Sequence, residues 1–185
     1  TEDASTYFVA LDAFAGTYGM GYGIYIDTDQ VSGSGGTSDP WGRNINAASE
    51  HLPEYALYVW HTDADAIENA QLTTWNGSGW DYPTLISVGG EQGYSGANDW
   101  LEYGIPKSAL GSPAKIALEA FTIPGCCHAQ DTVPSDPNVA YTAPDYSGDV
   151  TSLSAFYLFP PSAIVLDLTS PADGAKFAEP EIEVS

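Results

Sequence analysis

Gly21–Gly42, GYGIYIDTDQVSGSGGTSDPWG, decides the fold, because an alternating apolar stretch runs directly into Asp-Thr-Asp and a loop rich in glycine and serine. The alternation places every second residue of Tyr22–Ile26 on one face, which is typical of a strand with a buried side. Asp27 and Asp29 follow where this strand ends. The stretch therefore predicts a β-strand that supports two carboxylates at its end.

This pair of carboxylates suits a hard cation such as calcium. Calcium takes about six to eight oxygen ligands at roughly 2.3 to 2.6 Å, so Asp27 and Asp29 need further acids, and Asp39 and Asp131 are the candidates. The spacing is not that of an EF-hand loop, because its glycine and closing glutamate are missing from their places. The alternative is that Asp27 and Asp29 only shape and solvate a turn.

The composition is strongly acidic. The 185 residues include 25 Asp and Glu against 4 Lys and Arg, which gives a formal net charge of -21, and 43% of the residues are hydrophobic. This length and content suit one domain of ordinary size with an appendage. A negative field repels phosphate backbones and anionic lipid headgroups, attracts divalent cations and tolerates neutral sugars. We therefore expect neither a nucleic-acid partner nor insertion into a membrane.

The chain shows no apolar run near the roughly 20 residues that span a bilayer, and no basic and apolar leader. We expect a mature or excised soluble segment. Few lysines, 12 tyrosines, 5 tryptophans and much glycine, serine and threonine favour an extracellular or cell-surface location.

The two cysteines, Cys126 and Cys127, are adjacent and so do not join distant strands. Three interpretations stay open. The pair forms a strained vicinal disulfide, bridges to another chain, or binds metal with the neighbouring His128. Zinc-ligand spacings argue against the third, because they place residues between the cysteines.

Most of the chain consists of short stretches in which apolar and polar residues alternate, separated by residues typical of turns. The expected strands are Thr6–Ala13, Gly19–Asp27, Glu54–His61, Ala70–Trp75, Trp80–Val88, Trp100–Ile105, Lys115–Thr122, Leu153–Phe159 and Ala163–Leu168. Asn76-Gly77 is typical of a tight hairpin turn. Pro106–Gly111, PKSALG, predicts one short helical turn with proline at its start and glycine at its end. The pattern predicts an all-β fold, an antiparallel jelly-roll-like β-sandwich.

Three sequence motifs resemble one group of proteins. Leu101–Thr122, LEYGIPKSALGSPAKIALEAFT, joins two strands through Ile-Pro and a Ser-Ala-Leu-Gly turn; TYFVALDA precedes GYGIYIDTD; and His128–Pro137 reads HAQDTVPSDP. These motifs resemble the DOMON-like modules, related to family 9 carbohydrate-binding modules, that accompany extracellular glucodextranases and pullulanases. Over roughly residues 5–160, the resemblance implies a jelly-roll-like sandwich, bound calcium and sugar binding without catalysis. Such modules usually carry a further strand ahead of the position where this chain begins.

The last residues resemble a different domain. After Pro160-Pro161, AIVLDLTSPADGAKFAEPEIEVS resembles the opening of an immunoglobulin-like domain, so we divide the chain into a module, 1–160, and a linker and C-terminal strand extension, 161–185. Two strands alone are marginal in water and need a partner. The residues expected to assemble are Ile164, Val165, Leu166, Leu168, Ile182 and Val184. They either pack on their own domain or add to the sheet edge of a neighbouring copy, which would give an open filament. The alternative is a fragment excised from a longer secreted protein.

The prediction of sugar binding depends on aromatic side chains. If Leu57 and Val59 face the core, Tyr58 and Trp60 form a surface platform on which a pyranose ring stacks. The other candidates lie at turns or strand ends and are Trp41, Trp75, Trp80 and Trp100. Burial in the core is the alternative for each single tryptophan, and the two that flank the Asn-Gly turn fit a cross-strand pair.

Sequence signatures of catalysis are absent. The chain has no G-x-S-x-G elbow and no glycine-rich phosphate loop with its lysine. Because it has 25 acidic residues, two carboxylates that could act as acid and base can always be chosen, so such a pair is not informative. We expect no enzyme. Two functional classes remain: a calcium-stabilised module that binds polysaccharide, or a structural subunit of an extracellular filament or surface layer assembled by β-strand exchange.

Overall fold

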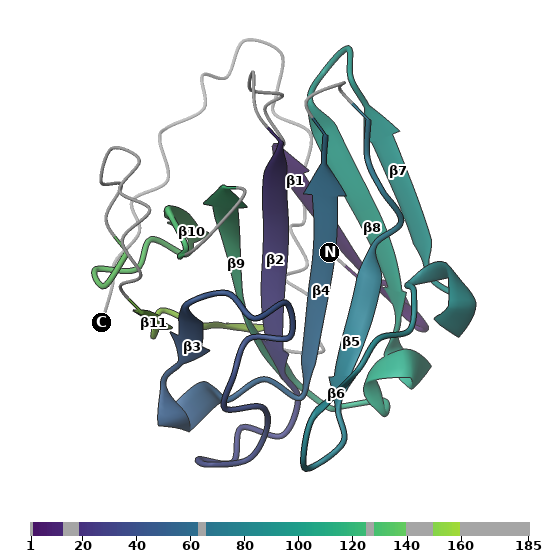
Figure 1. Ribbon diagram of the computed structural model, residues 1–185. Coiled ribbons are helices and arrows are strands. Elements are labelled where there is room, and N and C mark those ends of the chain that lie inside the picture. Colours follow the sequence, from purple (N-terminus) through teal and green to yellow (C-terminus); the bar gives the residue numbers. More distant parts are fainter. Residues whose placement is uncertain (1, 13–18, 63–65, 125–127, 140–149, 160–185) are drawn as a thin grey trace, which may run out of the picture.

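The chain folds as an all-β sandwich of two antiparallel sheets (Figure 1). The computed structural model describes residues 2–12, 19–62, 66–124, 128–139 and 150–159. The smaller sheet contains, in order, β1 (Thr6–Asp12), β8 (Trp100–Pro106) and β7 (Glu91–Ser95). The larger sheet contains, in order, β10 (Asp131–Val133), β9 (Ile116–Pro124), β2 (Met20–Asp27), β4 (Tyr55–His61), β5 (Gln71–Trp75) and β6 (Trp80–Asp81). β12 (Tyr157–Phe159) also pairs with β9.

The main core lies between the two sheets. The predicted inward face of β2, from Tyr22 to Ile26, lies in this core. Its buried partners include Tyr7, Leu57, Val59, Leu72, Leu101, Tyr103 and Ile105. Burial of each large apolar side chain stabilises the fold by roughly 1.5 to 3 kcal/mol. The alternation in the sequence therefore predicts the core face of β2 correctly.

A second apolar cluster covers the opposite, outer face of the larger sheet. It contains Tyr25, Tyr58 and Phe121, and segment 28–53 lies over them with Trp41 and Ile45. Segment 28–53 leaves the sheet after β2, returns at β4, and carries β3 (Ile45–Ala47) and the short 3-10 helix η1 (Ser49–His51). β3 pairs in parallel with β11 (Thr151–Leu153). Because this segment adds a third layer, β2 and β4 are buried on both faces.

Glycines in β2 make room for this outer aromatic layer. A Cβ at Gly23 would lie 2.4 Å from the Phe121 ring and 3.0 Å from the Tyr58 ring, and a Cβ at Gly21 would lie 2.6 Å from Ile123. Distances under 3.0 Å are ones that real Cβ atoms essentially never show. Side chains of β4 and β9 therefore pack over β2 at Gly21 and Gly23, on the same outer face that carries Tyr25.

Both predicted turns are confirmed. Gly77 has φ of 94°, and the hairpin joins β5 to β6. PKSALG forms the 3-10 helix η3 (Lys107–Leu110), and Gly111 ends it with φ of 75°.

Several predicted strands need correction. Trp80–Val88 is strand only as far as Asp81, and its end forms the 3-10 helix η2 (Ile86–Val88). Leu153–Phe159 divides into β11 and β12, because the backbone N–H groups between them bind carboxylates. The short strands β3, β7 and β10 were not predicted.

Some predictions lie outside the described residues: the strand Ala163–Leu168, the whole 161–185 extension and both cysteines. No helix in the described ranges is long and apolar enough to cross a membrane.

Candidate functional site

Asp39 fixes segment 28–53 to the outer face of the larger sheet. Its buried carboxylate accepts hydrogen bonds from the hydroxyl groups of Tyr25, at 2.8 Å, and of Tyr58. It also accepts the backbone N–H groups of Trp41, at 2.9 Å, and Arg43, at 2.8 Å. Burial raises the pKa of the Asp39 carboxyl, although these donors oppose the shift. Asp39 therefore anchors segment 28–53 to the larger sheet. The prediction that it joins Asp27 and Asp29 in one group of carboxylates is wrong.

The anchor places Trp41 at one wall of a shallow pocket. The Trp41 ring stacks on the Tyr58 ring with centroids 4.4 Å apart and an interplanar angle of 23°. Its indole Nε1–H donates to Gln71 Oε1 at 2.7 Å. The Tyr82 hydroxyl donates to the carbonyl oxygen of Pro40 at 2.8 Å, which fixes a second aromatic side chain to the same segment. Two aromatic walls of the pocket are thus held by hydrogen bonds.

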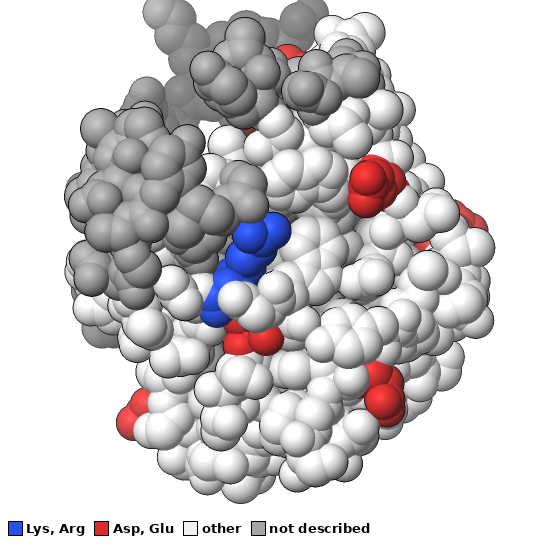
Figure 2. Space-filling view, viewed as in Figure 1, with Lys and Arg blue, Asp and Glu red and all other residues white. Residues whose placement is uncertain are grey.

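This surface, which we call the aromatic pocket, has a volume of about 520 Å³. Its lining residues are Trp41, Arg43, Trp60, Glu68, Gln71 and Tyr82. They come from segment 28–53, from β4 and β5, and from the chain next to these strands. Figure 2 shows this side of the molecule, where one small basic area lies near the centre and acidic groups lie at separate positions in a mostly uncharged surface.

The chemistry of the aromatic pocket suits a sugar. Trp41 and Trp60 are partly exposed and Tyr82 is 52% exposed, so indole and phenol rings are open to a ligand. Aromatic rings pack against the C–H face of a pyranose, while carboxylate, amide and guanidinium groups bind its hydroxyls. Such groups line the pocket at Glu68, Gln71 and Arg43.

The structure separates the aromatic residues predicted to bind sugar. Trp41 and Trp60 line the pocket together. Tyr58 is completely buried, so its predicted place in a surface platform is wrong; it lies beneath Trp41 and supports it. Tyr82, which follows β6 directly, was not among the predicted aromatic residues.

The remaining tryptophans lie elsewhere. Trp75 and Trp80 are cross-strand partners whose rings meet edge to face with centroids 5.5 Å apart. The Trp80 indole also donates to the carbonyl oxygen of Ser38 at 2.8 Å, so it helps to hold the loop. Trp100 lies on the smaller sheet and is 48% exposed. None of these three lines the aromatic pocket.

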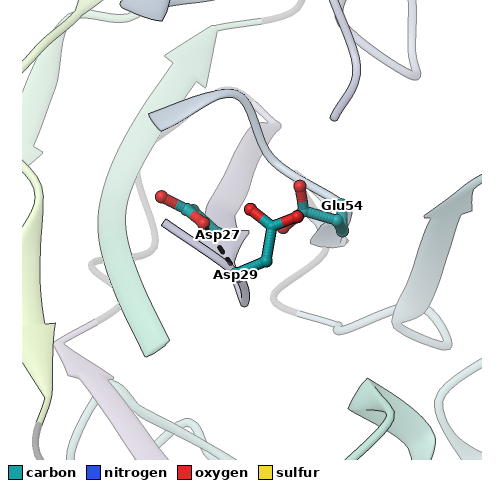
Figure 3. A group of neighbouring side chains, drawn as sticks. All are labelled: Asp27, Asp29 and Glu54. Atoms are coloured by element: carbon teal, nitrogen blue, oxygen red, sulfur yellow. Dashed lines mark hydrogen bonds between the residues drawn. The ribbon is translucent and has the colours of Figure 1, made fainter. Parts of the chain in front are cut away.

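Three carboxylates meet where β2 ends and β4 begins. Ligand atoms of Asp27, Asp29 and Glu54 lie within 4.8 Å of one another, and Figure 3 shows the Asp29 carboxylate between the other two. The antiparallel register pairs Ile26 with Tyr55, so Asp27, the last residue of β2, lies beside Glu54, the residue before β4. The sequence analysis did not place Glu54 in this group, although its position directly before a strand adjacent to β2 is the signal that would have identified it.

Hydrogen bonds hold the three carboxylates in place. Asp27 Oδ1 accepts the backbone N–H groups of Asp29 and Gln30, at 3.1 and 2.7 Å, and Asp27 Oδ2 lies 2.7 Å from His51 Nδ1. Asp29 accepts the Val31 N–H at 2.8 Å. These bonds confirm that both aspartates shape a turn. They leave lone pairs on the carboxylate oxygens for a cation, because each oxygen can accept two bonds.

Glu54 differs from the two aspartates in having a buried carboxylate oxygen that accepts no hydrogen bond from the described residues. Its Oε2 accepts the N–H of Thr28 at 2.7 Å, whereas its buried Oε1 has no hydrogen-bond partner among the described residues. Burial raises the pKa of the Glu54 carboxyl, and the negative charges of Asp29 and Asp27 raise it further. A cation bound among the three would offset this repulsion. Asp131, also predicted as a ligand, is exposed on β10 and is not part of this group.

Comparisons with models of protein families, with curated proteins and with solved structures give no match.

Proposed function

We propose that the chain is a non-catalytic extracellular module that binds polysaccharide in the aromatic pocket and is stabilised by calcium at Asp27, Asp29 and Glu54. The observation that carries the proposal is the convergence of Trp41, Trp60 and Tyr82 on one shallow pocket whose walls are held by buried anchors. The resemblance to carbohydrate-binding modules implies the same class of ligand.

A pre-organised surface is what a sugar site requires. The rings of Trp41 and Tyr82 are fixed before a ligand arrives, so binding loses little side-chain entropy. The pocket is shallow and partly polar, which predicts millimolar to micromolar affinity for a short oligosaccharide. A net charge of -21 favours a neutral polysaccharide over a polyanionic one.

Affinity electrophoresis tests the proposed function directly. The chain is run in native gels that contain dextran, pullulan, soluble starch or xylan, and its mobility is compared with that in a sugar-free gel. We expect marked retardation in at least one gel and its reversal by the matching oligosaccharide. Equal mobility in all five gels would contradict sugar binding by this module.

Calcium is proposed as a stabiliser of the turn after β2. Ligand linkage adds about 2.7 kcal/mol when free calcium is a hundred times its dissociation constant. For a domain of this size, about 1 kcal/mol corresponds to roughly 2 to 4 °C in the melting temperature. We therefore expect a chelator to lower the melting temperature by about 5 to 10 °C relative to millimolar calcium.

The matched variants for calcium are Asp29→Asn and Asp131→Asn. The first removes a charge from the proposed site and should abolish the difference between calcium and chelator. The second removes an exposed charge outside the site and should keep it. A wild-type melting temperature that is the same in both buffers would show that the three acids only shape the turn.

Assembly by strand exchange stays a prediction, because its strands, Ile164–Leu168 and Ile182–Val184, lie outside the described residues.

A further inference from the structure

A second acidic pair is buried away from the two proposed sites. Glu119 lies on β9 and is completely buried, and Asp136 follows β10 and is 2% exposed. The N–H of Ala155 donates to both, at 3.0 Å to Glu119 Oε2 and at 3.1 Å to Asp136 Oδ2. Two carboxyl oxygens that share one donor in this way are close neighbours. Two neighbouring carboxyl groups in a buried place resist ionising together, so the charge of one raises the pKa of the other.

The surrounding donors indicate which carboxyl holds the proton. Asp136 also accepts the N–H of Asn138, at 2.7 Å, and the N–H and hydroxyl groups of Ser154. Burial favours the neutral form of Asp136, but these donors outweigh it and hold its pKa below the ordinary value. Glu119 accepts the Ala155 N–H on Oε2, and its Oε1 has no hydrogen-bond partner among the described residues. Burial, together with the charge of Asp136, raises the pKa of Glu119 to about 8.

Other titratable groups near the pair belong to elements packed around it. On β2, Tyr25 is the register partner of Glu119, and its hydroxyl is bound to Asp39. On β12, Tyr157 is the register partner of Leu118. From η1, His51 stacks on Phe156 at 5.0 Å and binds Asp27. β10 contributes the exposed Asp131. Asp136 is the charged group that acts on the Glu119 carboxyl.

We propose that Glu119 and Asp136 form a proton-sharing latch that holds residues 151–159 against the larger sheet and opens in alkaline solution. The donors of the latch, Ser154 and Ala155, lie between β11 and β12. When the shared proton passes to solvent, both carboxyl groups are negative and repel each other in a buried place. The segment with Ser154 and Ala155 is then released.

Opening of the latch also affects segment 28–53, which forms part of the aromatic pocket, because residues 151–159 contact this segment. β11 pairs with β3, which belongs to segment 28–53, and Phe156 stacks on His51 in the same segment. Release of residues 151–159 therefore uncovers part of the second apolar cluster, on the outer face of the larger sheet. This inference does not depend on sugar binding, because the latch and its release are properties of the chain alone.

The sign of the pH dependence follows from the raised pKa of Glu119. In the unfolded chain the group titrates near its ordinary value of 4.5, and in the folded chain near about 8. Between these values the folded state binds more protons than the unfolded state, so stability falls as pH rises. The latch is closed while the folded Glu119 keeps its proton, up to about pH 8, and opens above it.

Carbon-13 NMR of the glutamate carboxyl groups measures the titration directly. We expect the Glu119 signal, identified by its absence in Glu119→Gln, to titrate near pH 8. If this variant does not fold, through-bond assignment from the backbone identifies the signal instead. A Glu119 midpoint near 4.5 would overturn the proposal.

Hydrogen exchange then tests the release. After correction for intrinsic exchange rates, we expect amide protection over residues 152–159 to fall at least tenfold between pH 6.5 and pH 9 in the wild type. The control Glu102→Gln, at an exposed position on the smaller sheet, should behave in the same way. Glu119→Gln, whose amide can donate to Asp136 at any pH, should keep its protection. Protection that stays constant in the wild type, or falls as far in Glu119→Gln, would refute the latch.

Discussion

Asp39→Ala is expected to lower the free energy of unfolding by about 3 kcal/mol or more. The substitution removes the acceptor of two buried tyrosine hydroxyls and two backbone N–H groups at once. Each buried donor left without a partner costs roughly 1 to 3 kcal/mol. Segment 28–53 would also lose its main polar tie to the larger sheet. Urea unfolding, followed by tryptophan fluorescence, measures the change.

The control for this experiment is Asp131→Ala. Asp131 is exposed on β10, so its loss should change the free energy of unfolding by less than about 0.5 kcal/mol. If the two variants unfold at the same urea concentration, Asp39 is not the anchor that the geometry indicates.

Trp60→Ala is expected to weaken polysaccharide retention at least tenfold, which corresponds to about 1.4 kcal/mol of binding free energy. The change removes one aromatic wall of the pocket and the stacking surface that it offers. Trp60 packs over Gly19 and Gly21, so urea unfolding must show that the variant is still folded under the assay conditions. Affinity electrophoresis across a range of polysaccharide concentrations measures the retention.

Trp100→Ala is the matched control, because Trp100 is an exposed tryptophan on the opposite sheet and does not line the aromatic pocket. It should bind as the wild type does. Loss of retention in Trp100→Ala, with Trp60→Ala unaffected, would move the sugar site to the smaller sheet.

The sequence predicts the strands of this fold better than its layers. Alternation from Tyr22 to Ile26 predicts the core face of β2 correctly, because one polar or small face contrasts with an apolar one. In β4 both faces are apolar, and alternation alone does not distinguish an exposed platform from a face covered by a third layer. The burial of Tyr58 could therefore not be predicted, since its cover is an irregular loop held by Asp39.

The candidate sites were predictable only where they are local. Asp27 ends β2 and Asp29 lies two residues later, so their proximity is a property of that strand's end. Glu54 joins them through the register of β2 with β4, and Asp136 joins Glu119 through the chain's return to β9. Such pairings depend on which strands are neighbours. A pattern of alternating residues does not contain that information.

The most direct test of the central claim is an NMR titration of the five tryptophan indole N–H signals with oligosaccharides from whichever of the four polysaccharides retains the chain. We expect the signals of Trp41 and Trp60 to shift in a saturable manner, while those of Trp75 and Trp100 stay in place. Shifts confined to Trp100, or no indole shift with any of the four sugars, would contradict binding in the aromatic pocket.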